Sequence, residues 1–336
     1  MLATLVVAVT VFSVTQGMII PGVGHIAADF DISASTATWV LSGNLALMAV
    51  CLPLLGRIGD MVGRRRVLVV SLAFLTLGGV IAALAPSFPW LVGGRVIQGI
   101  GGGTFSMAYG LARENLPLHR QATGVAVLAS AAGVGGAVGP ALGGAIIDAW
   151  GYHAIFWLNA VTAAGALIGV IMVVPDIRRA VLDRVDLMGA CVLAVGVTLP
   201  LVVVSRTPDL GWSDIRTVLL LAASVLVLVA LVPIERRRRS PLIDVATLLL
   251  PRVALINTAT VLAGAANFAV LVLVPQLAQS ERGGLRLDAT QAGLLLLPGS
   301  VAMLIVGIYA GRIGRRIGNR LLLVTERRSA RPGWWR

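Results

Sequence analysis

The strongest polar chemistry within an apolar part of this sequence belongs to Arg95 and Gln98. They lie in the run Gly94-Arg95-Val96-Ile97-Gln98-Gly99, between charge-free segments at 67–94 and 96–112. A spacing of three residues places both side chains on one face of a helix. A cation and an amide on such a face could contact a polar substrate or relay a proton. The alternative is that Arg95 extends to the membrane interface near Trp90.

Two more amides lie in apolar stretches nearer the N-terminus. Gln16 is in the middle of the first stretch, and Asn44 is the strong polar group of the second. An unpaired amide in hydrocarbon is costly, so such a side chain should face the interior of a helix bundle. There Gln16 either joins helices or contacts a substrate. Together these residues form a candidate substrate or proton pathway: Arg95, Gln98, Gln16 and Asn44.

The sequence holds no pattern typical of a metal site or a catalytic centre. Cys51 and Cys191 are 140 residues apart, and neither CxxC nor HExxH spacing occurs. All 15 acidic residues lie at the ends of apolar stretches or between them, with Asp60 and Asp148 nearest to the interior. We therefore expect no enzyme, no metal and no cofactor.

The elements that must position these residues are membrane-spanning helices. Hydrophobic residues make up 57% of the chain, charged residues 12%, and the mean hydropathy is +0.92. In water such a chain would expose large apolar patches. Ten charge-free intervals can each hold a helix of about 20 residues; they are 1–28, 32–56, 67–94, 96–112, 121–147, 149–175, 187–205, 217–234, 253–280 and 289–311. The predicted fold is an all-α polytopic membrane protein with about ten transmembrane helices.

The net charge of +12 is explained by topology. All 27 basic residues are arginines, and with a cytoplasmic N-terminus 18 of them fall in inner loops and 4 in outer loops. Such an excess is the positive-inside signal of a membrane protein. The sequence thus predicts a multi-pass protein of the plasma membrane in contact with lipid, and no nucleic-acid partner.

A run rich in glycine and arginine separates the second stretch from the third and recurs near the C-terminus. We expect residues 56–66 to be a loop that turns at Gly56, Gly59 and Gly63, with Asp60 at a helix N-terminus. A copy 255 residues later keeps six positions, including Gly311, Arg312, Gly314, Gly318 and Arg320. An internal repeat of this kind predicts two related halves.

The fifth stretch carries glycines at a helical spacing. Gly135, Gly139 and Gly143 recur every four residues and form a groove of small residues on one face. Pro140 lies inside the same stretch, with Gly144 close behind. Because proline removes a backbone hydrogen bond, we expect a bend there.

In this order the runs resemble the signatures of the major facilitator superfamily. The Gly/Arg run resembles the loop between its second and third helices, and R-x-x-Q-G-x-G-G resembles its fourth helix. The run G-x-x-x-G-P-x-x-G-G, from Gly135 to Gly144, resembles the fifth-helix signature associated with antiporters. Two extra spans followed by E-R-x-x-x-x-P-L-I-D at 235–244 are similar to the fourteen-helix drug/proton antiporter branch.

The resemblance implies a division of the chain and a function. Residues 1–175 would be a six-helix half, 176–250 a two-helix linker, 251–324 the first two helices of the second half, and 325–336 a tail outside the pattern. Four further spans of the branch are missing, so the chain looks truncated. The implied function is proton-coupled export of small molecules by alternating access, by a monomer. The alternative is a truncated remnant that does not transport.

The resemblance also assigns a gating role to the Gly/Arg loop, and one feature departs from it. The loop residues Gly56, Gly63, Arg64 and Arg65 would hold Asp60, which in the family docks against a helix of the opposite half and latches the inner face. A local ion pair that only shapes the turn is the alternative. The branch often carries an aspartate near the position of Phe12, and this chain does not.

The arginine asymmetry predicts which loops face the cytoplasm. A cysteine introduced at Arg65 or Arg238 should resist an impermeant thiol reagent in intact cells, whereas one at Asp209 should react. Labelling is measured with and without permeabilisation. The reverse pattern would refute the orientation.

Overall fold

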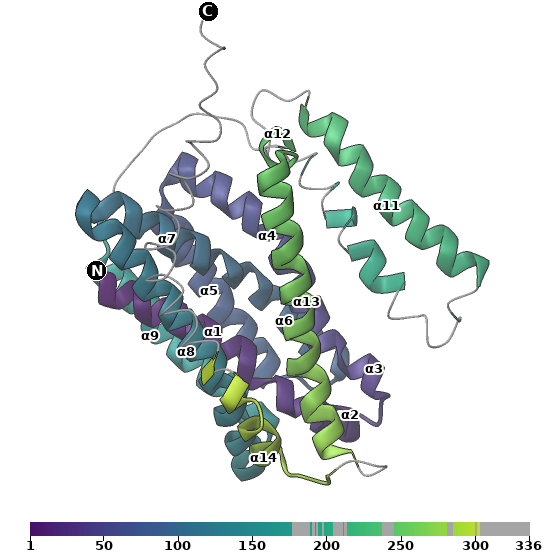
Figure 1. Ribbon diagram of the computed structural model, residues 1–336. Helices are drawn as coiled ribbons and strands as arrows, with labels where there is room; N and C mark the ends of the chain where they lie inside the picture. Colours follow the sequence, from purple (N-terminus) through teal and green to yellow (C-terminus); the bar gives the residue numbers. More distant parts are fainter. Residues whose placement is uncertain are drawn as a thin grey trace, which may run out of the picture.

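The computed structural model of the chain is a bundle of long helices (Figure 1). It describes residues 1–176, 189, 192, 194–196, 198–203, 211, 214–236, 245–280, 285–299 and 301–302. Among these, six helices are long and apolar enough to cross a membrane. The predicted all-α membrane bundle is confirmed. Parts of the spans expected at 187–205 and 289–311, and the whole Gly/Arg copy at 311–320, lie outside the described residues.

Residues 1–175, here called the first half, supply most of the packed bundle. Its helices are α1 (Leu2–Met18), η1 (Ile20–Gly22), α2 (Val23–Asp29), α3 (Ala34–Ala37), α4 (Trp39–Val62), α5 (Arg64–Ala83), α6 (Phe88–Gln98), η2 (Gly99–Gly102), α7 (Gly103–Asn115), α8 (Leu118–Trp150) and α9 (Tyr152–Val173). Beyond it lie α11 (Ile215–Arg236), α12 (Val245–Leu248), α13 (Pro251–Gln279) and α14 (Ala289–Leu294).

The fourth span, expected to be a single helix, is divided in the structure. It consists of α6, a turn of 3-10 helix at Gly99–Gly102, and α7. Glycine has a low helix propensity and 3-10 turns have fewer favourable hydrogen bonds, so a glycine run is where a helix changes its winding most easily. The change places Arg95 and Gln98 at the end of a short helix instead of in the middle of a long one.

The turn between the second and third spans is also shorter than expected. Helix α4 continues through Gly56 and Gly59 to Val62, and α5 begins at Arg64. The chain turns at Gly63 alone, whose φ of 103° disfavours other residues. The prediction of a loop over 56–66 was therefore wrong, because continuing the helix keeps the backbone hydrogen bonds intact.

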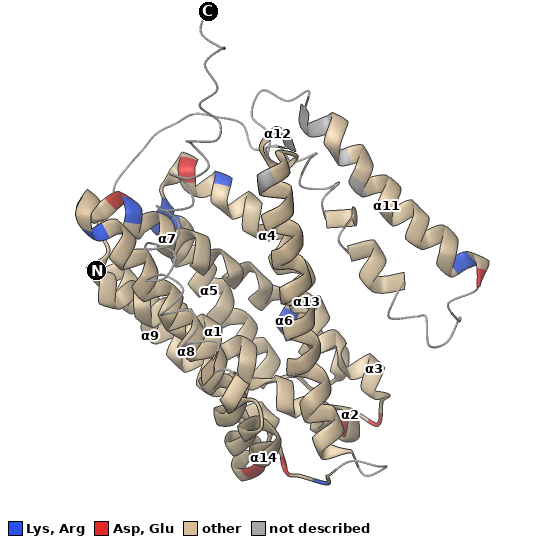
Figure 2. Cartoon of the chain, in the orientation of Figure 1, with Lys and Arg blue, Asp and Glu red and all other residues tan. Residues whose placement is uncertain are grey.

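Most charged residues of the first half lie at the two ends of the bundle, with Arg95 on α6 between them (Figure 2). One end, here called the Arg64 end, holds the junctions of α4 with α5 and of α7 with α8. The opposite end, here called the Asp148 end, holds the junctions of α8 with α9 and of α13 with α14. Between them the outer surface is apolar, with Leu255 of α13 72% exposed, as expected for contact with lipid.

The glycines of the fifth span pack α8 against α1. A Cβ added at Gly135 would lie 2.6 Å from Cβ of Ser13, and one at Gly139 would lie 2.9 Å from the carbonyl oxygen of Val14. One at Gly143 would overlap the carbonyl of Met18. The three glycines predicted to share a face do so, and they bring two helix backbones into direct contact.

This contact predicts a difference between two neighbouring glycines of α8. Gly143→Ala should lower the unfolding temperature in detergent by several degrees, because forcing an added methyl into packed backbone costs about 1–3 kcal/mol. Gly136→Ala is the control, since a Cβ there meets nothing within 4 Å. Equal unfolding temperatures for the two variants would contradict the packing.

Candidate functional site

The guanidinium of Arg95 is enclosed inside the first half. The residue is only 1% exposed and is the largest fully buried side chain of the described residues. Its Nε donates to the carbonyl oxygen of Val40 at 3.1 Å, and its Nη1 donates to Oε1 of Gln98 at 2.8 Å. Both acceptors are neutral. The position excludes the interpretation in which Arg95 extends to the interface.

The other predicted pathway residues join Arg95 in one chain of hydrogen bonds. Gln16 donates from Nε2 to Oδ1 of Asn44 at 2.8 Å, and Asn44 donates from Nδ2 to the carbonyl oxygen of Arg95 at 2.9 Å. Oε1 of Gln16 is buried and has no hydrogen-bond partner. The structure thus brings together all four residues, from α1, α4 and α6, whereas their contact with a substrate stays a prediction.

Close backbone contacts position this chain. A Cβ at Gly78 of α5 would lie 2.6 Å from Cγ of Gln98, and one at Gly99 would lie 2.6 Å from the carbonyl oxygen of Asn44. These contacts let α6 approach α4 and α5 so closely that Nε2 of Gln98 reaches the carbonyl of Leu75 at 3.4 Å. The glycine run beside Arg95 therefore provides the space in which the polar groups meet.

A second buried polar contact was not anticipated from the sequence. Thr15 donates from Oγ1 to Oδ1 of Asn159 at 2.9 Å, and both residues are 2% exposed. The contact links α1 to α9 next to Gln16. The signal that could have found it is an asparagine inside an apolar span, the same signal that selected Asn44.

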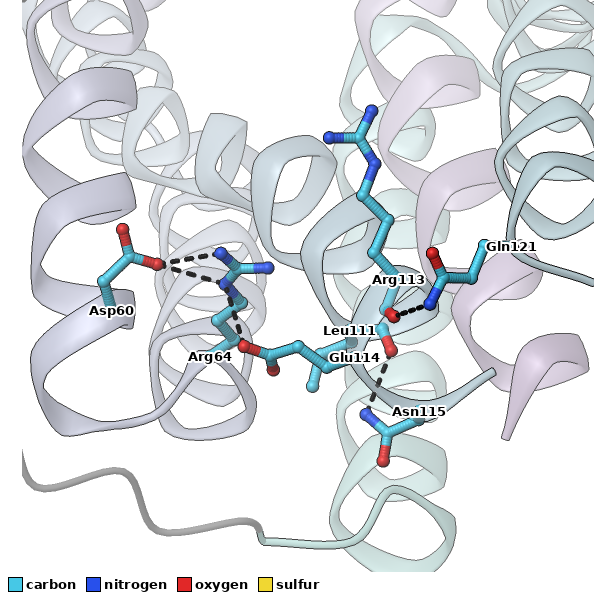
Figure 3. A network of polar contacts seen from close by, with 7 residues as sticks. All are labelled: Asp60, Arg64, Leu111, Arg113, Glu114, Asn115 and Gln121. Carbon is cyan, nitrogen blue, oxygen red and sulfur yellow. Dashed lines mark hydrogen bonds and ion pairs between the residues drawn. The ribbon is translucent and has the colours of Figure 1, made fainter. Parts of the chain in front are cut away.

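At the Arg64 end, Arg64 joins two carboxylates (Figure 3). Its Nη2 lies 2.9 Å from Oδ1 of Asp60, and its Nε lies 3.7 Å from Oε1 of Glu114. Asp60 belongs to the last turn of α4, so the expected position at a helix N-terminus was wrong. Helix α4 continues past the expected loop, and this extension places the carboxylate one turn before Arg64.

The next two arginines contact α9 and the segment that directly follows it. Arg65 donates from Nη2 to the carbonyl oxygen of Ile171 at 2.6 Å, near the end of α9. Arg66 pairs with Asp176 at 3.2 Å. Asp60 itself makes the local ion pair with Arg64, and the docking of Asp60 on the opposite half stays a proposal. The three arginines thus fasten the start of α5 to α4, α7 and α9.

The described residues include no cluster of three or more His, Cys, Asp or Glu side chains that could hold a metal ion. The hydrogen-bonded chain from Gln16 to Gln98 consists of amides, a backbone carbonyl and one guanidinium. Such groups can donate to or accept from an organic molecule.

The comparisons with known proteins agree with this architecture. The family model described as the Major Facilitator Superfamily matches residues 5–326. The chain belongs to the major facilitator superfamily. Solved structures of the POT family of transporters have the same fold: one in complex with a thioalcohol-conjugated peptide has a TM-score of 0.65 at 16% identity, over 95% of this chain and 70% of that one.

Several relatives carry names that refer to multidrug resistance or to transport. "Multidrug resistance protein B homolog" of Mycobacterium tuberculosis is 32% identical over 94% of this chain and 57% of its own length. "Multidrug resistance protein Stp" of the same organism is 28% identical over 88% and 55%. The "Probable actinorhodin transporter" of Streptomyces coelicolor is 28% identical over 88% and 52%. The chain spans about half the length of the curated relatives it matches.

The geometry at the Arg64 end predicts that substitutions of Asp60 and of Arg64 lower the unfolding temperature by different amounts. Asp60→Asn should leave the unfolding temperature almost unchanged, since the Asp60 side chain is 57% exposed and such a pair contributes less than about 1 kcal/mol. Arg64→Gln should lower it more, because Arg64 contacts both α4 and α7. Thermal unfolding in detergent measures both. An equal decrease would show that Asp60 itself stabilises the turn.

Proposed function

We propose that this chain belongs to an exporter of small, drug-like molecules that works by alternating access. The observation that carries the proposal is the polar chain from Gln16 to Gln98, which joins three helices in the mainly apolar interior of the first half. Polar groups buried in a membrane are costly and mark pathways for substrates or ions. The drug-related names of the relatives supply the substrate class.

Proton antiport is the proposed driving force. It is supported by the likeness to the drug/proton antiporter branch and by a buried cation whose two partners are neutral. Charge buried without a counter-charge attracts an anionic or electron-rich group of the cargo and repels a second cation. Arg95 would therefore favour the cargo and disfavour a proton bound close to it, while the guanidinium itself stays charged.

The decisive experiment compares dye export by the parent chain with dye export by the variant Arg95→Ala. Cells or proteoliposomes with the chain are loaded with fluorescent drug-like dyes, and efflux is followed with and without a protonophore. Arg95→Ala should lower the efflux rate at least about tenfold, a loss of about 1.4 kcal/mol or more of transition-state stabilisation. Membrane abundance should stay constant.

The matched control is Arg113→Ala. Arg113 is an exposed arginine at the Arg64 end whose side chain points away from Glu114 (Figure 3). The variant Arg113→Ala should export the dyes at the rate of the parent chain. Normal export by Arg95→Ala would refute the role of Arg95, and absence of export by the parent for every dye would refute the proposed function. Unchanged efflux with a protonophore would refute proton antiport alone.

A further inference from the structure

Asp148 joins the first half of the chain to the second. It lies in the last turn of α8, and its carboxylate accepts three hydrogen bonds from the first two residues of α14. Oδ1 accepts from the backbone N–H of Ala289 at 3.3 Å. Oδ2 accepts from the N–H of Thr290 at 2.7 Å and from its hydroxyl at 2.5 Å. These residues are more than 140 positions apart in the sequence.

The contact is more than an ordinary cap of a helix start. The first N–H groups of a helix have no partner within it, and the chain just before α14 already supplies an acceptor. Asp288 accepts from the N–H of Gln291 at 2.6 Å. Asp148 accepts from the N–H groups of Ala289 and Thr290, which Asp288 does not bind. The start of α14 therefore has one acceptor side chain from its own segment and one from the other half.

Two glycines hold the same helices in backbone contact. A Cβ at Gly144 of α8 would overlap the carbonyl of Ala289, and a Cβ at Gly293 of α14 would overlap the carbonyl of Pro140. Gly144 and Asp148 are one helical turn apart and share a face. Gly135, Gly139 and Gly143 face α1 instead. Helix α8 therefore packs one row of glycines against the first half and places Gly144 and Asp148 against α14 of the second half.

A second side chain, Gln279, also joins the halves at the same end by a hydrogen bond. Gln279, the last residue of α13, donates from Nε2 to the carbonyl oxygen of Pro21 at 3.2 Å. Pro21 is in η1, where the first span is interrupted. Ala289 is 0% exposed and packs into an apolar cluster with Met18, Ile146 and Ile147. The Asp148 end is thus closed by polar and apolar contacts between the halves.

We propose that Asp148 is the acceptor of a latch that holds the halves together at the Asp148 end, and that must release when the transport site opens there. The inference rests on the proposed alternating access. Asp148 is a positioning residue: it contacts no cargo and acts by setting the balance between the closed and the open arrangement. A shared carboxylate suits this role, because bonds to a charged acceptor are stronger than neutral ones and break together when α14 moves away.

The test measures the separation of the end of α8 from the segment that leads into α14. In a chain with Cys51→Ser and Cys191→Ser, cysteines at the exposed positions Trp150 and Leu285 carry spin labels, and pulsed EPR gives their distance distribution in nanodiscs. The parent should show mainly one short distance. In Asp148→Ala the ratio of long to short distances should rise about tenfold, the effect of losing about 1.4 kcal/mol of hydrogen bonding to a charged group.

Two further variants separate a latch from a local cap. Asp288→Ala removes the acceptor within the α14 segment and should leave the distances unchanged. Thr290→Val removes one of the three donors at nearly constant shape and should give a smaller rise than Asp148→Ala. Unchanged distances in Asp148→Ala, or an equal rise in Asp288→Ala, would overturn the proposal.

The distance measurement is independent of transport. Suppose that the parent chain exports no dye, but that Asp148→Ala increases the distance between the spin labels. This result would refute the proposed export and support the latch. A chain that exports dye and shows the same distances with and without Asp148 would refute the latch alone.

Discussion

Direct contact between helix backbones is the constraint on which this bundle depends. Within a bilayer, helices gain little by hiding apolar side chains from one another, since the lipid is apolar too. Association must come from dispersion and from hydrogen bonds at short range, and both need the helices to be close. Glycine provides that closeness for α1 with α8, for α5 with α6, and for α8 with α14.

The polar residues at the centre follow from the same closeness. Asn44 can reach the carbonyl of Arg95, and Gln98 the carbonyl of Leu75, only because α4, α5 and α6 nearly touch. No carboxylate of the described residues pairs with the guanidinium of Arg95. It donates instead to the carbonyl of Val40 and to the amide of Gln98. The packing of the glycines and the position of the charge are therefore not separable here, since loosening the glycine contacts would also displace the guanidinium of Arg95.

Much of the architecture could be predicted because it rests on local properties of the sequence. The length of a charge-free stretch indicates a span, and a spacing of four residues places Gly135, Gly139 and Gly143 on one face. The turn at Gly63 and the break at Gly99–Gly102 could not be located in the same way. Glycine permits many backbone conformations, so a sequence with several glycines does not show which of them the chain uses.

The partners of charged and polar side chains were harder still to predict. Asp148 was noted as an acid near the interior, but its donors are backbone groups more than 140 residues away, which no local pattern indicates. Asp60 was expected at the start of a helix and lies at the end of one. Both cases depend on where helices end in space, and a shift of one turn changes the partner of a side chain completely.

Both polar contacts between the halves involve a side chain on one helix and backbone groups on the other. Asp148 binds amides of Ala289 and Thr290, and Gln279 binds the carbonyl of Pro21. Except at Thr290, whose hydroxyl also takes part, the backbone side of each contact is indifferent to which side chain stands there. These hydrogen bonds can therefore persist when exposed side chains near them change, whereas the buried Ala289 and the glycines of the same contact are fixed by packing.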